Sequence, residues 1–186
     1  RFSTFLNYTF QYSRGNADNP TQNFDRAGGV LDPITRLIPM SWDQRHTFNT
    51  TVSYGMDSWG LSLTGYFDSG TPFTWEPLDI SILDDISFLP NNEYMPSTFS
   101  VDMNAHYFLR LRNDMGLKFG LQVYNLLDEL NDAWVDSRTG QAYNSIIRDN
   151  DLDGHYSDFN DYEDTIHDPS MFEAPRFVKF SMDITF

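Results

Sequence analysis

The chain alternates hydrophobic and polar residues along six stretches, and this period of two is that of a β-strand with two different faces. The fifth stretch, for example, reads Leu-Lys-Phe-Gly-Leu-Gln-Val over 117–123. The six predicted strands cover residues 2–13, 42–55, 59–68, 98–112, 116–127 and 176–186. The pattern predicts an all-β protein with one contiguous antiparallel sheet, in which neighbouring strands follow the sequence order.

The predicted connections alternate between long and short. The long ones cover about 14–41, 69–97 and 128–173, whereas only Met56, Asp57 and Ser58 join the second strand to the third. Bacterial outer-membrane barrels have this alternation, because their periplasmic turns are short and their extracellular loops are long. The predicted strands also exceed the roughly 5 to 6 residues usual in soluble sheets and reach the roughly 9 to 11 that cross a bilayer. We therefore expect an antiparallel transmembrane β-barrel segment with long extracellular loops; a soluble β-sandwich is the alternative.

Six strands are too few to close such a barrel, because the smallest have about 8. An open sheet in lipid would expose unpaired backbone groups at a cost of several kcal/mol each. We therefore expect residues 1–186 to be the C-terminal part of one outer-membrane barrel domain, completed by strands upstream. The first residues, Arg1 and Phe2, already belong to an alternating stretch and carry no secretory signal, so the N-terminus of an exported protein would also lie upstream.

Composition narrows the function classes. The chain contains 16% aromatic residues but has no apolar run near the roughly 18 residues of a membrane-spanning helix, which excludes a helical membrane protein. Its 12 basic and 27 acidic residues give a net charge of -15, which opposes binding to nucleic acid through the phosphates. Cysteine is absent, so disulfide and thiolate chemistry are excluded. No catalytic motif stands out, and a small barrel hydrolase with a Ser, His and acid triad is the only enzymatic alternative.

Three short motifs carry a resemblance to a known family. They are Trp42-Asp43-Gln44-Arg45-His46-Thr47, Val123-Tyr124-Asn125-Leu126-Leu127-Asp128, and Ala174-Pro175-Arg176 before a strand that ends at Phe186. In this order they resemble the C-terminal barrel of TonB-dependent outer-membrane receptors, over essentially the whole chain.

That resemblance implies a barrel of 22 strands in the outer membrane of a Gram-negative-type bacterium, closed by an N-terminal plug. It implies uptake of a scarce small solute with energy from the inner membrane. The implied partners are outer-membrane lipid, an energy-coupling protein, the plug domain and the barrel-assembly machinery. Neither the plug nor the energy-coupling motif is present in these 186 residues. A passive porin, or a structural barrel component of a larger outer-membrane assembly, is the alternative.

The resemblance also implies an assembly signal in the last strand, formed by Phe180, Met182, Ile184 and Phe186. The alternative is that these side chains merely face lipid. Two further groups are candidates on the lumen side. Asp43 and Arg45 are two residues apart and can form an ion pair or contact a ligand. His106, Arg110 and Arg112 can line the lumen wall, either as solvated side chains or against an anionic plug surface or solute.

The third long connection is acidic and contains the start of a calcium-loop pattern. Asp149-Asn150-Asp151-Leu152-Asp153-Gly154 alternates oxygen ligands and then supplies the glycine that permits a sharp turn. We expect Asp149, Asp151 and Asp153 to bind Ca²⁺ with Asp158 or Asp161, although Asn160 stands where an EF-hand has Glu. The alternative is a solvated acidic surface. The long connections also carry aromatic side chains that can grip a solute, namely Trp75, Tyr94, Trp134, Tyr143, Tyr156 and Tyr162.

Overall fold

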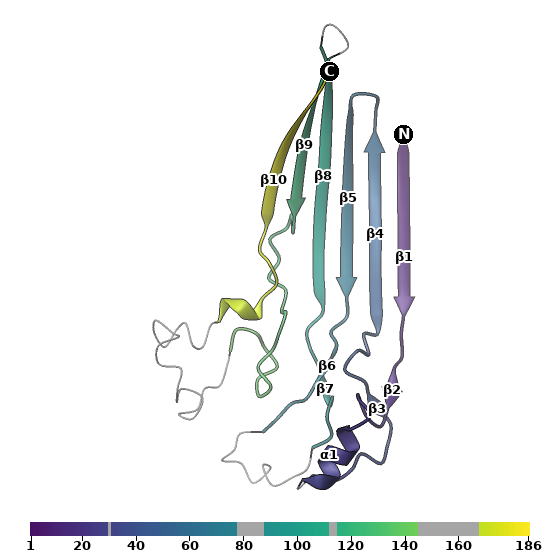
Figure 1. The fold of residues 1–186 in the computed structure, drawn as a ribbon, viewed down its shortest axis with the longest axis vertical. Helices are drawn as coiled ribbons and strands as arrows, with labels where there is room; N and C mark the ends of the chain where they lie inside the picture. Colours follow the sequence, from purple (N-terminus) through teal and green to yellow (C-terminus); the bar gives the residue numbers. More distant parts are fainter. Residues whose placement is uncertain (30, 78–87, 112–114, 145–167) are drawn as a thin grey trace.

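The chain is all-β and is built on one six-stranded antiparallel sheet, seen in a computed structural model (Figure 1). The structure describes residues 1–29, 31–77, 88–111, 115–144 and 168–186. The strands are β1 (Phe2–Phe10), β4 (His46–Gly55), β5 (Trp59–Asp68), β8 (Thr98–Arg110), β9 (Gly116–Tyr124) and β10 (Phe177–Thr185). Their order, β1-β4-β5-β8-β9-β10, confirms the predicted antiparallel pairing between sequence neighbours. Among the described residues the sheet is open, with β1 and β10 at its edges.

The long connections contain the remaining elements. The first holds β2 (Arg14–Gly15), α1 (Gln22–Gly28) and β3 (Ile38–Pro39). The second holds β6 (Pro72–Phe73) and β7 (Glu93–Tyr94), and the third holds the 3-10 helix η2 (Pro169–Met171). Figure 1 places all these elements at one end of the sheet and the short β4–β5 turn at the other. No helix in the described part of the chain is long and apolar enough to cross a membrane.

Several predicted strand ends are wrong. The strand predicted from residue 42 begins at His46, because the backbone N–H of Asp43 donates to the carbonyl of Met40 and closes a turn. The strand predicted to residue 127 ends at Tyr124, because Asn125 and Asp128 adopt left-handed backbone conformations with φ of 49° and 58°. The first strand ends at Phe10 instead of residue 13, where the chain turns toward β3: the N–H of Met40 donates to the carbonyl of Ser13.

The strand register assigns the two faces of the sheet. One row of cross-strand neighbours is Val52, Leu63, Met103, Val123 and Val178. The next row, on the opposite face, is Ser53, Ser62, Asn104, Gln122 and Lys179. Hydroxyl pairs cross the polar face, with the Oγ atoms of Ser53 and Ser62 2.9 Å apart. The period-two prediction of an apolar and a polar face is therefore confirmed in the sheet.

Phe108 breaks the alternation of β8, since it lies on the polar face, where Phe5 of β1 and Phe177 of β10 also lie. A Cβ added to Gly116 would lie 2.6 Å from the ring of Phe108, so this ring covers the glycine backbone. Aromatic side chains compensate in this way for the missing side chain of a strand glycine.

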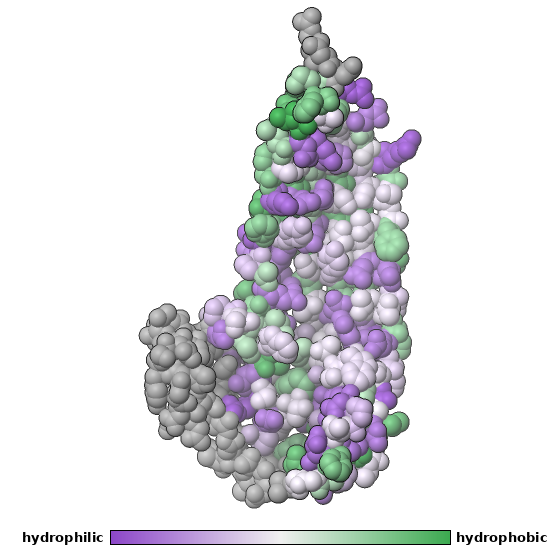
Figure 2. All heavy atoms as spheres, in the orientation of Figure 1, coloured by the Kyte–Doolittle hydropathy of each residue, from purple (hydrophilic) through white to green (hydrophobic). Residues whose placement is uncertain are grey.

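The apolar face of the sheet lacks the cover that a soluble protein gives it. In the middle of that face Leu63 is 37% exposed and Val52 is 38% exposed, while Phe180 near its edge is 67% exposed. The small buried cluster of Ile34, Ile38 and Met40, with Leu89 packed on it, lies instead among the long connections. Figure 2 shows a sheet face that is mostly hydrophilic to neutral, with hydrophobic side chains gathered at its margins. Most hydrophobic side chains of the sheet are therefore exposed, and the small buried cluster contains none of them.

Candidate functional site

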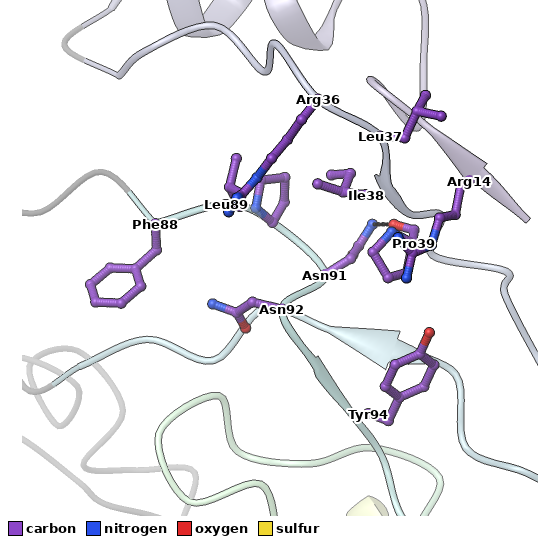
Figure 3. A pocket seen from close by; sticks show the side chains of 11 residues that line it. Arg14, Arg36, Leu37, Ile38, Pro39, Phe88, Leu89, Asn91, Asn92 and Tyr94 are labelled. Carbon is purple, nitrogen blue, oxygen red and sulfur yellow. Dashed lines mark hydrogen bonds between the residues drawn. The ribbon is translucent and has the colours of Figure 1, made fainter.

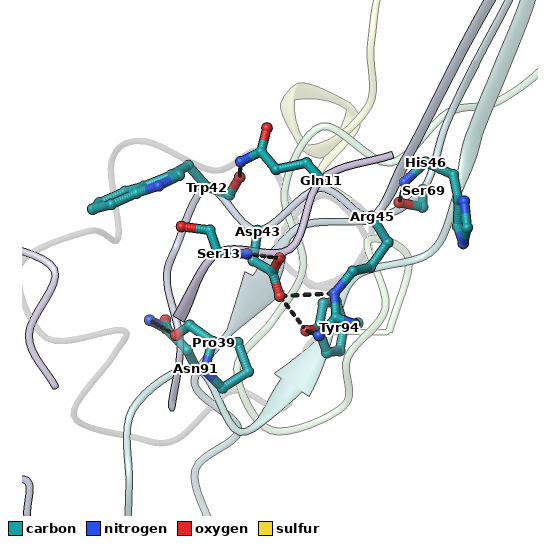
Figure 4. A network of polar contacts seen from close by, with 10 residues as sticks. All are labelled: Gln11, Ser13, Pro39, Trp42, Asp43, Arg45, His46, Ser69, Asn91 and Tyr94. Atoms are coloured by element: carbon teal, nitrogen blue, oxygen red, sulfur yellow. Dashed lines mark hydrogen bonds and ion pairs between the residues drawn. The ribbon is translucent and has the colours of Figure 1, made fainter. Parts of the chain in front are cut away.

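The first and second long connections meet at a buried carboxylate, Asp43, whose side chain is fully buried (Figure 4). One oxygen of Asp43 accepts from the backbone N–H of Ser13 at 2.7 Å. The other accepts from Nε of Arg45 at 2.8 Å and from the hydroxyl of Tyr94 at 2.9 Å. The Asp43–Arg45 ion pair expected from the sequence is therefore confirmed, just ahead of β4. It joins three segments of the chain.

Arg45 is held on several sides. Its Nη2 donates to the Tyr94 hydroxyl at 3.0 Å, and its guanidinium lies 4.2 Å from the centre of the Tyr12 ring, a cation–π distance. Burial alone would raise the pKa of Asp43, but the hydrogen bonds from Ser13, Tyr94 and Arg45 lower it below its ordinary value. The Asp43 carboxylate is therefore ionised at neutral pH. Its oxygens accept hydrogen bonds from Ser13, Arg45 and Tyr94, so it holds the connections together.

Asn91 makes a second link between the same connections. Its Nδ2 donates to Oδ2 of Asp18 at 2.8 Å and to the carbonyl of Pro39 at 3.0 Å, and its backbone N–H donates to Oγ1 of Thr74 at 3.0 Å. Its φ of 57° lies in the left-handed region, which Asn tolerates better than most residues. Sequence reasoning missed Asn91; the Pro90-Asn91 pair, a turn signal, was the available clue.

A pocket of about 580 Å³ opens beside this network, between the first and second long connections (Figure 3). Arg14, Arg36 and Ile38 line it from the first connection, and Leu89 and Asn92 line it from the second. This volume falls in the range of about 300–1,000 Å³ typical of small-molecule sites. Of the aromatic residues expected to grip a solute, Tyr94 lines this pocket, and Trp75 packs against Phe88 of its wall with ring centres 5.8 Å apart.

The two later motifs form a clamp at the same end of the sheet. Nδ2 and Oδ1 of Asn125 bond to the carbonyl and N–H of Glu129 at 2.9 and 3.0 Å. Asp128 accepts from the backbone N–H of Arg176 at 3.0 Å and from its Nη2 at 3.1 Å. The chain leaving β9 is thereby tied to the chain entering β10. These motif residues have a structural role in the described part of the protein.

Two of the three candidates for the lumen wall lie on the polar face of the sheet. His106 and Arg110 lie in β8 on the polar face, opposite Gly120 and Gly116 of β9. The His106 ring covers Gly60 of β5, where an added Cβ would lie 2.5 Å from it. Arg112 lies outside the described residues, and the predicted lumen position of all three residues stays a prediction.

The calcium prediction also stays a prediction. Asp149, Asp151, Asp153, Asp158 and Asp161 all lie outside the described residues. Within the ranges that the structure does describe, no group of three or more His, Cys, Asp or Glu side chains is arranged to hold a metal ion.

The predicted assembly-signal residues lie along β10 and beyond it. Phe180, Met182 and Ile184 belong to the apolar face, opposite Leu121, Phe119 and Leu117 of β9. Phe186 follows the strand and is 98% exposed. Their position suits both the signal role and plain contact with lipid, and the signal role stays a prediction.

Aromatic side chains with polar tips mark both ends of the apolar face. Near the long connections, the Tyr8 hydroxyl and Nδ1 of His46 are 2.8 Å apart, and Phe10 packs on the same histidine. Near the short turn, the rings of Tyr54 and Trp59 lie 5.5 Å apart. Amphipathic rings of this kind favour the boundary between an apolar phase and water.

Comparisons with protein-family models, with curated proteins and with solved structures gave no match to this chain.

Proposed function

We propose that this chain is a six-stranded part of an outer-membrane β-barrel receptor that takes up a scarce small solute with energy from the inner membrane. The observation that carries the membrane part is the uncovered apolar face of the sheet. Soluble monomers rarely expose a contiguous apolar patch of more than a few hundred Å². Here exposed hydrophobic residues of this face lie on β1, β4, β5, β8 and β10, among them Leu6, Leu63 and Phe180, while Leu121 of β9 is partly exposed and Val123 is buried. A lipid bilayer would supply the cover that this face lacks.

The dimensions of the strands support a bilayer as that cover. β8 has 13 residues, which at about 3.4 Å per residue extend about 44 Å. With a tilt of about 40°, a strand of that length rises about 34 Å, slightly more than the roughly 30 Å of a hydrocarbon core. On the same geometry His46 and Tyr54 of β4 are about 21 Å apart along the membrane normal, so the Tyr8–His46 and Tyr54–Trp59 pairs lie inside the two boundaries, close to the roughly 25 Å height of the apolar band of such barrels. On this orientation, the polar face with Ser62 and Asn104 lines the lumen.

The connections favour a receptor over a passive porin. A passive channel needs a constriction, whereas a receptor needs a shaped surface outside the membrane that holds its solute. The buried Asp43 and Asn91 hydrogen bonds fix two connections together beside an open pocket, which suits capture of a solute. Energy-dependent release, the plug and the coupling protein are proposed from the resemblance to TonB-dependent receptors. The remaining strands of the barrel would come from chain outside residues 1–186.

A matched pair of cysteine substitutions tests the proposed orientation, since the chain has no native cysteine. Leu63 and Ser62 are adjacent in β5 and lie on opposite faces. In the full-length protein in outer membranes, a membrane-impermeant maleimide should label Ser62→Cys at least about ten times faster than Leu63→Cys, because lipid excludes the reagent from the apolar face. Rapid labelling of Leu63→Cys would contradict the proposal.

Transport itself requires a second experiment. Liposomes containing the full-length protein should leak small sugars no faster than liposomes without it, and uptake of the solute in cells should stop when the inner-membrane proton gradient is dissipated. Passive leakage, or uptake that survives dissipation, would favour the porin instead.

A further inference from the structure

The pocket between the first and second long connections has an unusual charge for this protein. The chain carries a net charge of -15, yet none of the described residues that line the pocket is acidic, and two are arginines, Arg14 and Arg36. The described lining of the pocket is therefore basic, although the protein as a whole is acidic.

These two arginines differ from others in the described part of the chain. Arg45 and Arg176 each form an ion pair with a carboxylate, at 2.8 and 3.1 Å. Arg14 instead lies 5.1 Å from the centre of the Tyr12 ring, and neither it nor Arg36 forms an ion pair with a described residue. Both side chains are exposed. Their guanidinium groups are thus available to an anion from solution.

The wall between the two arginines is apolar and rigid. Figure 3 shows Ile38 and Pro39 lying between Arg36 and Arg14, with Leu89 across from them. Ile38 is only 4% exposed and packs in the buried cluster with Leu89. Asn91 fixes the second connection to the carbonyl of Pro39 at 3.0 Å. A wall held in this way loses little conformational freedom when a ligand binds.

We propose that this pocket binds an elongated organic anion with two carboxylate or phosphate groups on an apolar body. Arg14 and Arg36 each bind one anionic group, since guanidinium matches the planar oxygens of carboxylate and phosphate. The apolar body packs over Ile38 and Leu89. The inference rests on the proposed function in one respect: it names the class of solute that the receptor captures at its extracellular end.

The probe for the test is 2,6-naphthalenedicarboxylate, a rigid dianion with an apolar centre, titrated into the purified full-length protein. An ion pair at an exposed side chain contributes up to about 1 kcal/mol, so Arg14→Gln and Arg36→Gln should each weaken binding by about three- to fivefold. Arg110→Gln is the control, because Arg110 lies on the polar face of β8 outside the pocket. It should leave the affinity unchanged. Arg14→Lys and Arg36→Lys should retain more affinity than the Gln variants.

A comparison of ligands on the unaltered protein covers the case in which a variant fails to fold. The dianion should bind about three to five times more tightly than 2-naphthoate, which carries one carboxylate. Equal affinities, absence of saturable binding, or equal losses in the Arg110→Gln variant would each overturn the proposal. The maleimide experiment on Leu63 and Ser62 separates the two claims, because the pocket can bind the dianion even if the sheet is not in a membrane.

Discussion

Replacing Asp43 with Asn should release the junction of the first and second long connections while leaving the sheet intact. Oδ2 of Asp43 accepts from both Arg45 and Tyr94, and an amide nitrogen at that position would face two donors. Loss of one charge-assisted and one neutral hydrogen bond at a buried position costs about 3 kcal/mol. Tyr94→Phe keeps the ion pair but loses the hydroxyl, which donates to Asp43 and accepts from Arg45. The bond from Arg45 is exposed and adds little, so the variant should cost about 1 kcal/mol.

Hydrogen exchange of the full-length protein, followed by mass spectrometry, measures the local effect of losing these hydrogen bonds. The amides of Ser13 and Met40 report on the junction, because the first donates to Asp43 and the second to the carbonyl of Ser13. At about 1.4 kcal/mol for each factor of ten, Asp43→Asn should speed their exchange roughly a hundredfold and Tyr94→Phe roughly fivefold. Amides in the middle of β5 serve as the control and should not change. Unchanged exchange at Ser13, or equal acceleration in β5, would refute the conclusion that Asp43 holds the first and second long connections together.

Three further predictions rest on contacts in the structure, and a fourth rests on the sequence alone. The pKa of Asp43 in the folded state lies below its ordinary value of 3.8. The contribution of the Asp43 carboxylate to stability is therefore complete above pH 3.8 and is lost as the pH falls through the folded-state pKa. Protection of the Ser13 amide from exchange, corrected for intrinsic rates, should be equal at pH 7 and pH 5 and should decline below about pH 3.8. Asn125→Ala should cost about 3 kcal/mol, because it removes the side-chain hydrogen bonds to Glu129 and Ala174 and strains a residue with φ of 49°. Arg176→Ala breaks an exposed ion pair and should cost under about 1 kcal/mol. Exchange of the Glu129 amide measures the effect of Asn125→Ala, and equal effects of the two variants would contradict the ranking. Gly70→Ala should make residues 71–77 and 88–96 more sensitive to protease, because its Cβ would overlap the backbone carbonyl of Met95. Gly28→Ala should not have this effect, because its Cβ would meet open space. Calcium should protect the third long connection from protease in the full-length protein, and Asp151→Asn with Asp153→Asn should abolish that protection; protection that is absent, or equal in the variant, would dismiss the site.

The sheet could be predicted from the sequence because its signal is local. Alternation in β9 and β10 specifies which side chains share a face, and a slip of one residue would place Leu121 and Phe180 among the polar residues. The strand ends were less predictable because distant residues decide them. Asp43 turns inward to meet Ser13, 30 positions away, and Tyr94, 51 positions away.

The candidate site was only partly predictable for the same reason. Asp43 and Arg45 could be paired because their spacing of two places them on one side of an extended chain. Nothing local to Asn91 or Arg36 specifies that the second connection folds against the first, so the pocket between them was not foreseen. The irregular connections have no repeating pattern from which a register could be derived, and their packing depends on single contacts such as that of Asn91 with Pro39.

The central claim, that the apolar face of this sheet lies in lipid, is tested most directly by a nitroxide scan along β8 in the full-length protein in bilayers. Single cysteines from 99 to 109 would each carry a spin label, and collisions with oxygen, which concentrates in lipid, would be compared with collisions with a water-soluble nickel complex. If the apolar face lies in lipid, collision rates should alternate with a period of two. Oxygen collisions should dominate at Val101, Met103 and Ala105, and collisions with the nickel complex should be relatively more frequent at Asp102, Asn104 and His106. Oxygen preference should peak near Met103. A profile without alternation, or one in which the nickel complex reaches Met103 as readily as Asn104, would contradict the claim.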